Sequence, residues 1–393
     1  MTEDDLDDSL DTPPGSRAQS RLRDAVITGF LGLCAAGPIA ATFGAVQTQS
    51  SVPVPPFTSD SFWSGRWTPK VETWLQESST LNYHIRGLYT AMLYATGLLE
   101  SPRVSLRGDW FFLRSTLTPR WETFQAVGKA RRAQFRSIAE RAAAAGVPLV
   151  VGVVPDRATI YCDIAFGTPQ PPEEKQRILE AMLHELRATG VQVVDLRPAL
   201  KVARRQGLEP YWRRDTHWTL DGAGAAATAI TGAVERTFPE VLAGRLPVRV
   251  AGTQETARMS DLIGMLGLRT ATPPGEDSPY AEVRALQERS RAVALQLQEA
   301  DGRWRAPRPQ IPDAPLALAG TSFSPLLGTA LVQAARVDVN TMHVRPAGGP
   351  LEGILGALDA IERGELRPRV LVWEFVERHA VSPLWSTPGQ RDR

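Results

Sequence analysis

Five short apolar runs, separated by segments of helical character, constrain the fold of this chain more than any other feature of its sequence. They are PLVVGVVP (148–155), VQVVDL (191–196), PLALAG (315–320), RVDVN (336–340) and RVLVWEF (369–375). The segments around them predict helices over 129–145, 173–189, 197–205, 219–234, 325–335 and 351–363. Strands that alternate with helices in this way predict an α/β fold, in which helices cover both faces of a mostly parallel sheet.

Other parts of the chain have weaker patterns. Periodicity fades between 252 and 312, where we expect a surface insertion with a polar helix near 281–300. The segment GDWFFL (108–113) is strand-like. Before it, the amphipathic stretches WTPKVETWLQESS and IRGLYTAMLYATGLL predict helices that lead into the main domain.

Residues 25–46 form an uncharged and mostly apolar run, AVITGFLGLCAAGPIAATFGAV. At about 1.5 Å per residue, such a helix can cross a hydrocarbon core of about 30 Å. Arg17, Arg21 and Arg23 precede the run and favour a cytoplasmic amino terminus with an exported body. A cleaved signal peptide and a buried core helix are the alternatives. We predict an uncleaved transmembrane anchor, because the run is longer than the usual apolar region of a signal peptide.

The anchor and the apolar runs together predict five parts. Residues 1–24 are a disordered cytoplasmic tail, and residues 25–46 are the anchor. Residues 47–107 are a linker, rich in Pro, Ser and Thr at its start, followed by the lead-in helices. Residues 108–380 are the folded domain, and residues 381–393 are a carboxyl-terminal tail.

Composition excludes several classes of function. The formal net charge is +1, whereas a protein that binds nucleic acid normally has a strongly basic face. The two cysteines, Cys34 and Cys162, are too few for a disulfide scaffold. The five histidines lack the spacing of a zinc site, and no Gly-rich phosphate loop follows a strand. We therefore expect no metal ion, no nucleotide and no nucleic-acid partner.

Two polar segments carry the residues best suited to catalysis. AGTSFSPLLG (319–328) follows a predicted strand and precedes a helix, and YWRRDTHWTLDGAG (211–224) lies between two helices. Ligands of open α/β sheets bind beyond the carboxyl ends of the strands. Ser322 in the first segment is a candidate nucleophile, His217 in the second a candidate base, and Asp215 a candidate for orienting the imidazole.

Each of these residues also has an ordinary structural interpretation. A serine after a strand is often a helix cap, and Asp and His are common in loops. Ser324 competes with Ser322 as a nucleophile, although its place just before Pro325 suits a cap better. The residues alone therefore leave the catalytic and the structural interpretations evenly matched.

A family resemblance favours catalysis. The segments that carry it are GDWFFL (108–113), VVPDRATIY (153–161), YWRRDTHWTLDGAGAAA (211–227), LALAGTSFS (316–324) and VLVWEFVER (370–378). In this order they resemble the alginate O-acetyltransferase family of periplasmic proteins with an SGNH-hydrolase-like domain. The resemblance covers about residues 60–380. It implies that Asp215, His217 and Ser322 form the catalytic triad.

The chain departs from the family pattern in three ways. GDWFFL replaces a GxDGWLF-like stretch, and Arg157 stands where lysine is more usual. We also expect no second, carbohydrate-binding domain, so the chain resembles the single-domain, anchored type. These departures bear on which polymer is bound more than on the reaction.

Further residues could line the site. The backbone amides of Gly320 and Thr321 could bind an oxyanion at the start of the following helix. Arg157 and Tyr161 follow a strand end and could face the site, although a structural role is common for such residues. Trp218 could stack on a sugar ring or pack in the core. We interpret Glu374 and Arg378 as a structural ion pair.

The resemblance implies an O-acetyltransferase that passes an acetyl group through Ser322 to a hydroxyl of an exported, alginate-like polysaccharide. It needs no cofactor, and a membrane-bound O-acyltransferase supplies the acetyl groups. The expected location is the bacterial inner membrane, with a single span and the catalytic domain in the periplasm. Two alternatives stay open: a carbohydrate acetyl esterase with the same triad, and a non-catalytic polysaccharide-binding scaffold.

Overall fold

The computed structural model describes residues 89–258, 260–268, 286, 288–345 and 349–385. The chain divides into two units, one of residues 1–100 with 264–286 and the other of residues 101–263 with 287–393. In the first unit, residues 89–95 are helical, within the second predicted lead-in helix. The predicted tail 1–24, the anchor 25–46 and the other lead-in helix lie outside the described residues. None of the helices that the structure describes is both long and apolar enough to cross a membrane.

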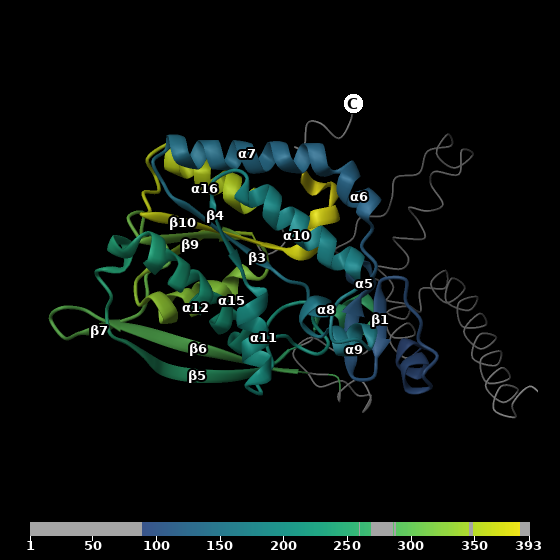
Figure 1. Cartoon of the computed structure of the whole chain (residues 1–393). Coiled ribbons are helices and arrows are strands. Elements are labelled where there is room, and N and C mark those ends of the chain that lie inside the picture. The colour runs from purple at the N-terminus through teal and green to yellow at the C-terminus, as the bar shows by residue number, and fades with distance from the viewer. Residues whose placement is uncertain (1–88, 259, 269–285, 287, 346–348, 386–393) are drawn as a thin grey trace, which may run out of the picture. The chain divides into compact units, whose positions relative to one another are not determined.

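A parallel sheet of five strands forms the centre of the second unit (Figure 1). Its strand order is β4-β3-β10-β8-β9. The bounds are β3 Leu149–Val154, β4 Gln192–Asp195, β8 Leu316–Gly320, β9 Val339–Val344 and β10 Val370–Val376. Every residue of β3, β8 and β10 is buried, as expected for strands covered on both faces. The predicted parallel sheet is therefore confirmed, although β9 begins three residues later than the run RVDVN indicates.

Helices cover both faces of this sheet (Figure 1). On one face lie α7 (Gly128–Ala144), α10 (Glu173–Arg187) and α16 (Glu352–Glu362), whose apolar side chains form one core cluster with the strands. On the other face lie α11 (Arg197–Arg205), α12 (Leu220–Thr237) and α15 (Ser324–Ala335), which form a second cluster. All six helices agree with the sequence predictions to within a few residues at their ends.

Shorter elements surround the sheet. An antiparallel hairpin of β1 (Val104–Arg107) and β2 (Trp110–Leu113) starts before residue 108, so the folded domain begins earlier than predicted. The remaining short helices are α5 Arg114–Leu117, α6 Trp121–Ala126, α8 Arg157–Ile160, α9 Cys162–Phe166 and α13 Asp261–Met265. Trp385, which we assigned to a tail, is fully buried against Phe135 and Trp373. The folded domain therefore extends at least to that residue.

The predicted polar helix near 281–300 is wrong for the residues from 288 onward, which the structure describes. They form β6 (Glu288–Gln298), which pairs along its length with β5 (Val248–Arg258) and at one end with β7 (Trp304–Arg305). Val293, Leu295 and Leu297 alternate with Ala294, Gln296 and Gln298 along β6 and pack against the core of the α12 and α15 face. This period of two is the signal of a half-buried strand. Arg289 and Arg291 lie on the same face of β6 as Val293, Leu295 and Leu297, and they interrupt that signal in the sequence.

Candidate active site

Ser322 lies at the carboxyl edge of the parallel sheet. It is in the turn between Gly320, the last residue of β8, and Ser324, the first residue of α15. Ligands of open α/β sheets bind at this edge, because the loops that follow the strands meet there. The turn therefore places the Ser322 hydroxyl where an α/β domain builds its sites.

Asp215 and His217 lie in the irregular segment between α11 and α12. An isolated antiparallel bridge joins Tyr211 to Trp218, and the backbone N–H of Trp212 donates to the His217 carbonyl at 3.3 Å. The Tyr211 hydroxyl donates to a backbone carbonyl just beyond β3. The two ends of the segment are thus fastened to each other and to the sheet, which leaves a closed loop with defined side-chain directions.

The turn and the loop bring three side chains into one hydrogen-bonded chain. His217 Nε2 lies 2.7 Å from Ser322 Oγ, and His217 Nδ1 lies 2.5 Å from Asp215 Oδ1. The backbone N–H of His217 also donates to Asp215 Oδ1 at 2.9 Å. Asp215 is fully buried, and the His217 side chain is 16% exposed. A serine nucleophile, its base and the acid that orients the base have this order in a triad.

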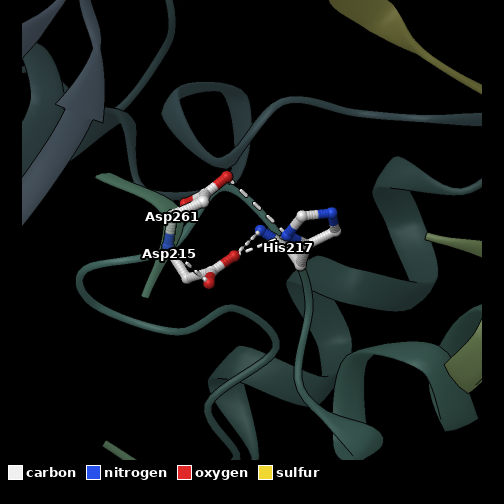
Figure 2. A group of neighbouring side chains, drawn as sticks. All are labelled: Asp215, His217 and Asp261. Atoms are coloured by element: carbon white, nitrogen blue, oxygen red, sulfur yellow. Dashed lines mark hydrogen bonds and ion pairs between the residues drawn. The ribbon is translucent and has the colours of Figure 1, made fainter. Parts of the chain in front are cut away.

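A second carboxylate, which no local sequence pattern indicated, lies beside His217 (Figure 2). Asp261 is the first residue of α13, and its backbone N–H donates to Asp215 Oδ2 at 3.0 Å. Its Oδ1 accepts from the Thr216 N–H at 2.8 Å, and its Oδ2 accepts from the Thr216 hydroxyl. The same Oδ2 lies 3.8 Å from His217 Nδ1. Burial, followed by the charge of Asp215, raises the pKa of Asp261 above its ordinary value.

One potential ligand atom from each of Asp215, His217 and Asp261 lies within 4.8 Å of the other two, a spacing that a cation could bridge. Each carboxylate oxygen already accepts a hydrogen bond, and both imidazole nitrogens have a partner. The group is therefore engaged as a hydrogen-bonded network around the imidazole, and a cation would have to displace those bonds.

Glu374 is a buried residue of β10, and its carboxylate binds the turn that carries Ser322. Its carboxylate accepts from the Thr321 N–H at 2.9 Å, from the Thr321 hydroxyl at 3.0 Å and from the Ser324 hydroxyl at 2.6 Å. Burial raises the pKa of Glu374, and the hydrogen bond from Ser324 opposes that rise. A charged residue inside the otherwise apolar run RVLVWEF was the sequence signal for this role.

Two predictions about neighbouring residues are corrected by these contacts. Arg378 lies 3.6 Å from Asp156 and does not form the predicted ion pair with Glu374. Ser324 donates its hydroxyl to Glu374 and does not cap α15, whose cap position is Phe323. Both errors arose because the partners, Asp156 and Glu374, come from segments that are distant in sequence.

Thr321 and Gly320, the predicted oxyanion residues, both lie against Glu374. The Thr321 N–H is already bound by Glu374. At Gly320, an added Cβ would lie 2.2 Å from Ser324 Oγ and 2.6 Å from Glu374 Oε2. Glycine is thus required at this position so that the buried carboxylate can approach the strand, and this is a packing requirement.

Arg157 and Tyr161 support the loop from inside. Arg157 is 5% exposed, and its Nη1 donates to the carbonyls of Trp212 at 2.5 Å and Asp215 at 2.6 Å. Burial lowers its pKa to about 10. Tyr161 is also buried, with its ring centroid 4.3 Å from that of Trp110, and burial raises its pKa to about 12. The described contacts of both residues are structural, within the protein interior.

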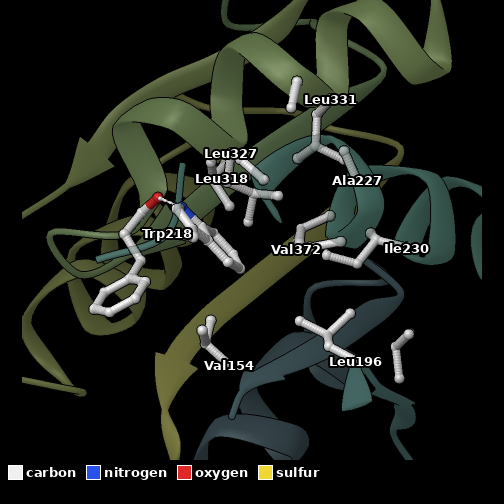
Figure 3. Close-up of a cluster of buried hydrophobic side chains, with 14 of the residues drawn as sticks. Val154, Leu196, Trp218, Ala227, Ile230, Leu318, Leu327, Leu331 and Val372 are labelled. Atoms are coloured by element: carbon white, nitrogen blue, oxygen red, sulfur yellow. Dashed lines mark hydrogen bonds between the residues drawn. The ribbon is translucent and has the colours of Figure 1, made fainter. Parts of the chain in front are cut away.

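Trp218 is fully buried and cannot stack on a sugar (Figure 3). Its indole lies among core side chains such as Leu318 and Val372, and its Nε1 donates to the Phe323 carbonyl at 3.0 Å. The Phe323 ring in turn lies 4.6 Å from the imidazole of His217. Trp218 therefore joins the loop of His217 to the turn of Ser322 through the core, which contributes to the 2.7 Å approach of those residues.

This fold and site define the class of the protein. The family described as SGNH hydrolase-like domain, acetyltransferase AlgX, matches residues 107–377, well over half of the chain. The chain therefore belongs to this family of SGNH hydrolase-like acetyltransferases. It is an O-acetyltransferase.

Individual proteins that are similar to this chain include AlgJ proteins of three Pseudomonas species. The chain is 26% identical to a probable alginate O-acetylase AlgJ of Pseudomonas fluorescens, over 80% of this chain and 78% of that one. It is 30% identical to a probable alginate O-acetylase AlgJ of Pseudomonas aeruginosa, over 63% of this chain and 62% of that one. The solved O-acetyltransferase domain of Pseudomonas putida AlgJ matches with a TM-score of 0.56 and 25% identity, covering 74% of this chain and 96% of that domain. These similarities indicate a polysaccharide O-acetyltransferase.

Proposed function

We propose that this chain transfers acetyl groups to hydroxyls of an exported, alginate-like polysaccharide through a triad of Ser322, His217 and Asp215. The observation that supports this most is the hydrogen-bonded chain from Ser322 Oγ through the imidazole to Asp215 Oδ1. It lies at the carboxyl edge of the sheet, in a member of an acetyltransferase family.

In the first half-reaction, Ser322 Oγ attacks the carbonyl carbon of an acetyl donor. His217 Nε2 takes the hydroxyl proton. Asp215 accepts a hydrogen bond from Nδ1–H, which fixes the tautomer that leaves Nε2 free to act as a base, and its charge stabilises the imidazolium that forms. The tetrahedral intermediate collapses, the donor's oxygen leaves with the proton from His217, and Ser322 carries the acetyl group.

In the second half-reaction, a sugar hydroxyl replaces the donor. His217 takes the hydroxyl proton, the sugar oxygen attacks the acetyl-serine carbonyl, and Ser322 leaves with the proton returned by His217. The Ser322 backbone N–H stabilises the negative oxygen in both halves. Among the described residues this N–H has no hydrogen-bond partner, in contrast to that of Thr321.

The proposal also includes a place for the enzyme and a source of acetyl groups. Residues 25–46 anchor the chain in the bacterial inner membrane, with the catalytic domain in the periplasm. A membrane-bound O-acyltransferase delivers the acetyl groups there. The uncharged run with arginines before it supports the anchor, and the similarity to AlgJ proteins supports the polymer substrate.

The experiment uses the full chain, purified in detergent, with a chromogenic acetyl ester as donor and a defined uronic-acid oligosaccharide as acceptor. Mass spectrometry measures acetylated oligosaccharide and free acetate, for the wild type and for Ser322→Ala and His217→Ala. We expect acetylated acceptor from the wild type and a loss of roughly a thousandfold or more in both variants.

The other outcomes identify the alternatives. Acetate without acetylated acceptor, equally sensitive to both substitutions, would indicate a carbohydrate acetyl esterase. Turnover that is independent of Ser322 would contradict the triad. If cells that produce Ser322→Ala still acetylate their polymer fully, the chain serves as a polysaccharide-binding scaffold.

A further inference from the structure

Asp261 connects three consecutive residues of the candidate site. Its backbone N–H binds Asp215, its carboxylate binds both the N–H and the hydroxyl of Thr216, and Oδ2 lies 3.8 Å from His217 Nδ1. These contacts use every polar atom that Asp261 presents to the loop. A residue that only filled space at this position would not need a carboxylate.

We propose that Asp261 is a positioning residue for the reaction, which orients Asp215 and places a second negative charge beside the imidazole of His217. This inference rests on the proposed function for its effect on catalysis. Its electrostatic part, the effect of one carboxylate on a neighbouring imidazole, is independent of the substrate.

The positioning follows from which oxygen each donor binds. Asp215 Oδ1 faces His217 Nδ1, and Asp215 Oδ2 faces the Asp261 N–H. The two donors on opposite oxygens prevent the carboxylate from rotating about its last bond. Because Asp261 also binds both polar groups of Thr216, the peptide that separates Asp215 from His217 cannot turn independently.

The negative charge of Asp261 lies beside the imidazole that becomes positive during the reaction. When His217 takes the Ser322 proton, the imidazole becomes positive, and two carboxylates then lie within 3.8 Å of Nδ1. The Asp261 side chain is 27% exposed, so solvent reduces the attraction without removing it. Arg157, which is buried behind the loop, opposes the two charges in part.

The neighbouring carboxylate of Glu288 has a different role from that of Asp261. Glu288, from β6, accepts from the Arg213 N–H at 2.8 Å and from Ser260 Oγ at 2.6 Å, so it fixes the start of the loop. Burial raises the pKa of Glu288. Asp215 and Asp261 are the two carboxylates that have ion-pair contacts with His217 among the residues the structure describes.

The test compares Asp261→Asn, which removes the charge and keeps the size, with Asp221→Asn. Asp221 is partly exposed, on α12, and pairs with Arg291 at 3.3 Å, so it is a matched loss of one carboxylate outside the site. Full-length chains with ¹³Cε1-labelled histidine are titrated by NMR, and His217→Gln assigns the His217 signal. Acetyl transfer is measured across the same pH range.

For D261N we expect the His217 titration midpoint to fall by roughly one pH unit, because the imidazolium loses an attractive charge. We expect kcat to fall by roughly 10- to 100-fold, with the acidic limb of the kcat/KM profile moving to lower pH. D221N should match the wild type in both measurements. Thr216→Val, which removes one hydrogen bond and keeps the charge, should lower kcat without moving the midpoint.

A His217 midpoint in D261N equal to that of the wild type would overturn the electrostatic role, and an unchanged kcat would overturn the positioning role. If D261N does not fold, Asp261→Ser and Asp261→Glu make the same comparison, without and with the charge. Failure of the proposed function looks different: the wild type then shows no Ser322-dependent acetyl transfer, while the NMR comparison still decides whether Asp261 acts on His217.

Discussion

The carboxylate of Glu374 accepts a hydrogen bond from the Ser324 hydroxyl at 2.6 Å, inside the turn that presents Ser322. The same carboxylate binds the N–H and the hydroxyl of Thr321. Thr321 and Ser324, which flank Ser322 and Phe323, are therefore both hydrogen-bonded to one buried carboxylate of the adjacent strand, β10. The direction of the Ser322 hydroxyl depends on a residue 52 positions later in the chain.

Glu374→Ala should lower both stability and activity. It leaves the buried donors of Thr321 and Ser324 without an acceptor, which costs roughly 2–4 kcal/mol of unfolding free energy. Because the turn is no longer held, kcat should fall by about 100-fold. Urea unfolding and acetyl-transfer kinetics measure the two effects. Glu374→Gln keeps one acceptor oxygen and should fall between the wild type and the alanine variant; full activity of Glu374→Ala would show that the turn holds itself.

The pair Ser322→Ala and Ser324→Ala separates the two serines of the GTSFS segment. Only Ser322 contacts His217, at 2.7 Å, so Ser322→Ala should reduce acetyl transfer by roughly a thousandfold or more. Ser324→Ala removes one of the three hydrogen bonds to Glu374 and should reduce the rate by about tenfold or less. Peptide mass spectrometry of enzyme quenched with a slow acetyl ester should find the acetyl group on Ser322. Acetylation of Ser324, or equal loss in both variants, would exclude this assignment.

Two glycines of α12 provide a test of the loop's packing. A Cβ on Gly222 would lie 2.1 Å from the Pro210 carbonyl oxygen, whereas a Cβ on Gly224 meets no atom within 4 Å. Gly222→Ala should therefore destabilise the protein by about 2–4 kcal/mol and lower activity, because Pro210 precedes the loop of His217. Gly224→Ala should stabilise it by roughly 0.5–1 kcal/mol, since alanine is the better helix former. Thermal unfolding distinguishes these opposite signs.

Arg157→Lys tests the structural interpretation of Arg157. Lysine cannot reproduce the planar guanidinium that binds the carbonyls of Trp212 and Asp215. We expect a loss of about 2–3 kcal/mol of unfolding free energy and a lower kcat, with KM for the acceptor little changed. A selective rise in KM, at wild-type stability, would instead place Arg157 in contact with the substrate.

His379 predicts a pH dependence of stability. Burial lowers its pKa to about 3, below the ordinary value of 6.5. Between these values the unfolded chain binds the proton and the folded chain does not, so stability is present above pH 6.5 and is lost as the pH falls towards 3. This group accounts for a loss of up to roughly 5 kcal/mol.

The measurement is urea unfolding of the wild type and of His379→Gln from pH 4 to pH 7. Glutamine does not titrate, so the variant should lose less stability on acidification than the wild type does. Parallel curves for the two proteins would show that His379 is not buried as a neutral group in solution. Matching far-UV spectra at pH 7 would control for an altered fold.

Local sequence determined the sheet, its helices and three side chains of the site. The apolar runs that became β3, β8 and β10 are buried along their whole length, so each is recognisable without knowledge of its neighbours. The segments of Asp215, His217 and Ser322 are short and polar between regular elements. For that reason the sequence alone, aided by a family resemblance, selected these residues.

Only the tertiary structure decided which side chains support them. Asp261 follows β5, in a region that the sequence marked as a surface insertion, and Glu374 lies inside an apolar run. Neither position has a local pattern that indicates its partner, because the contacts join residues 46 and 50 positions apart. The sequence also left open whether Trp218 packs in the core and which group binds the Thr321 N–H. Burial and the partner of a backbone N–H are properties of the packed chain, and they are set by segments distant in sequence.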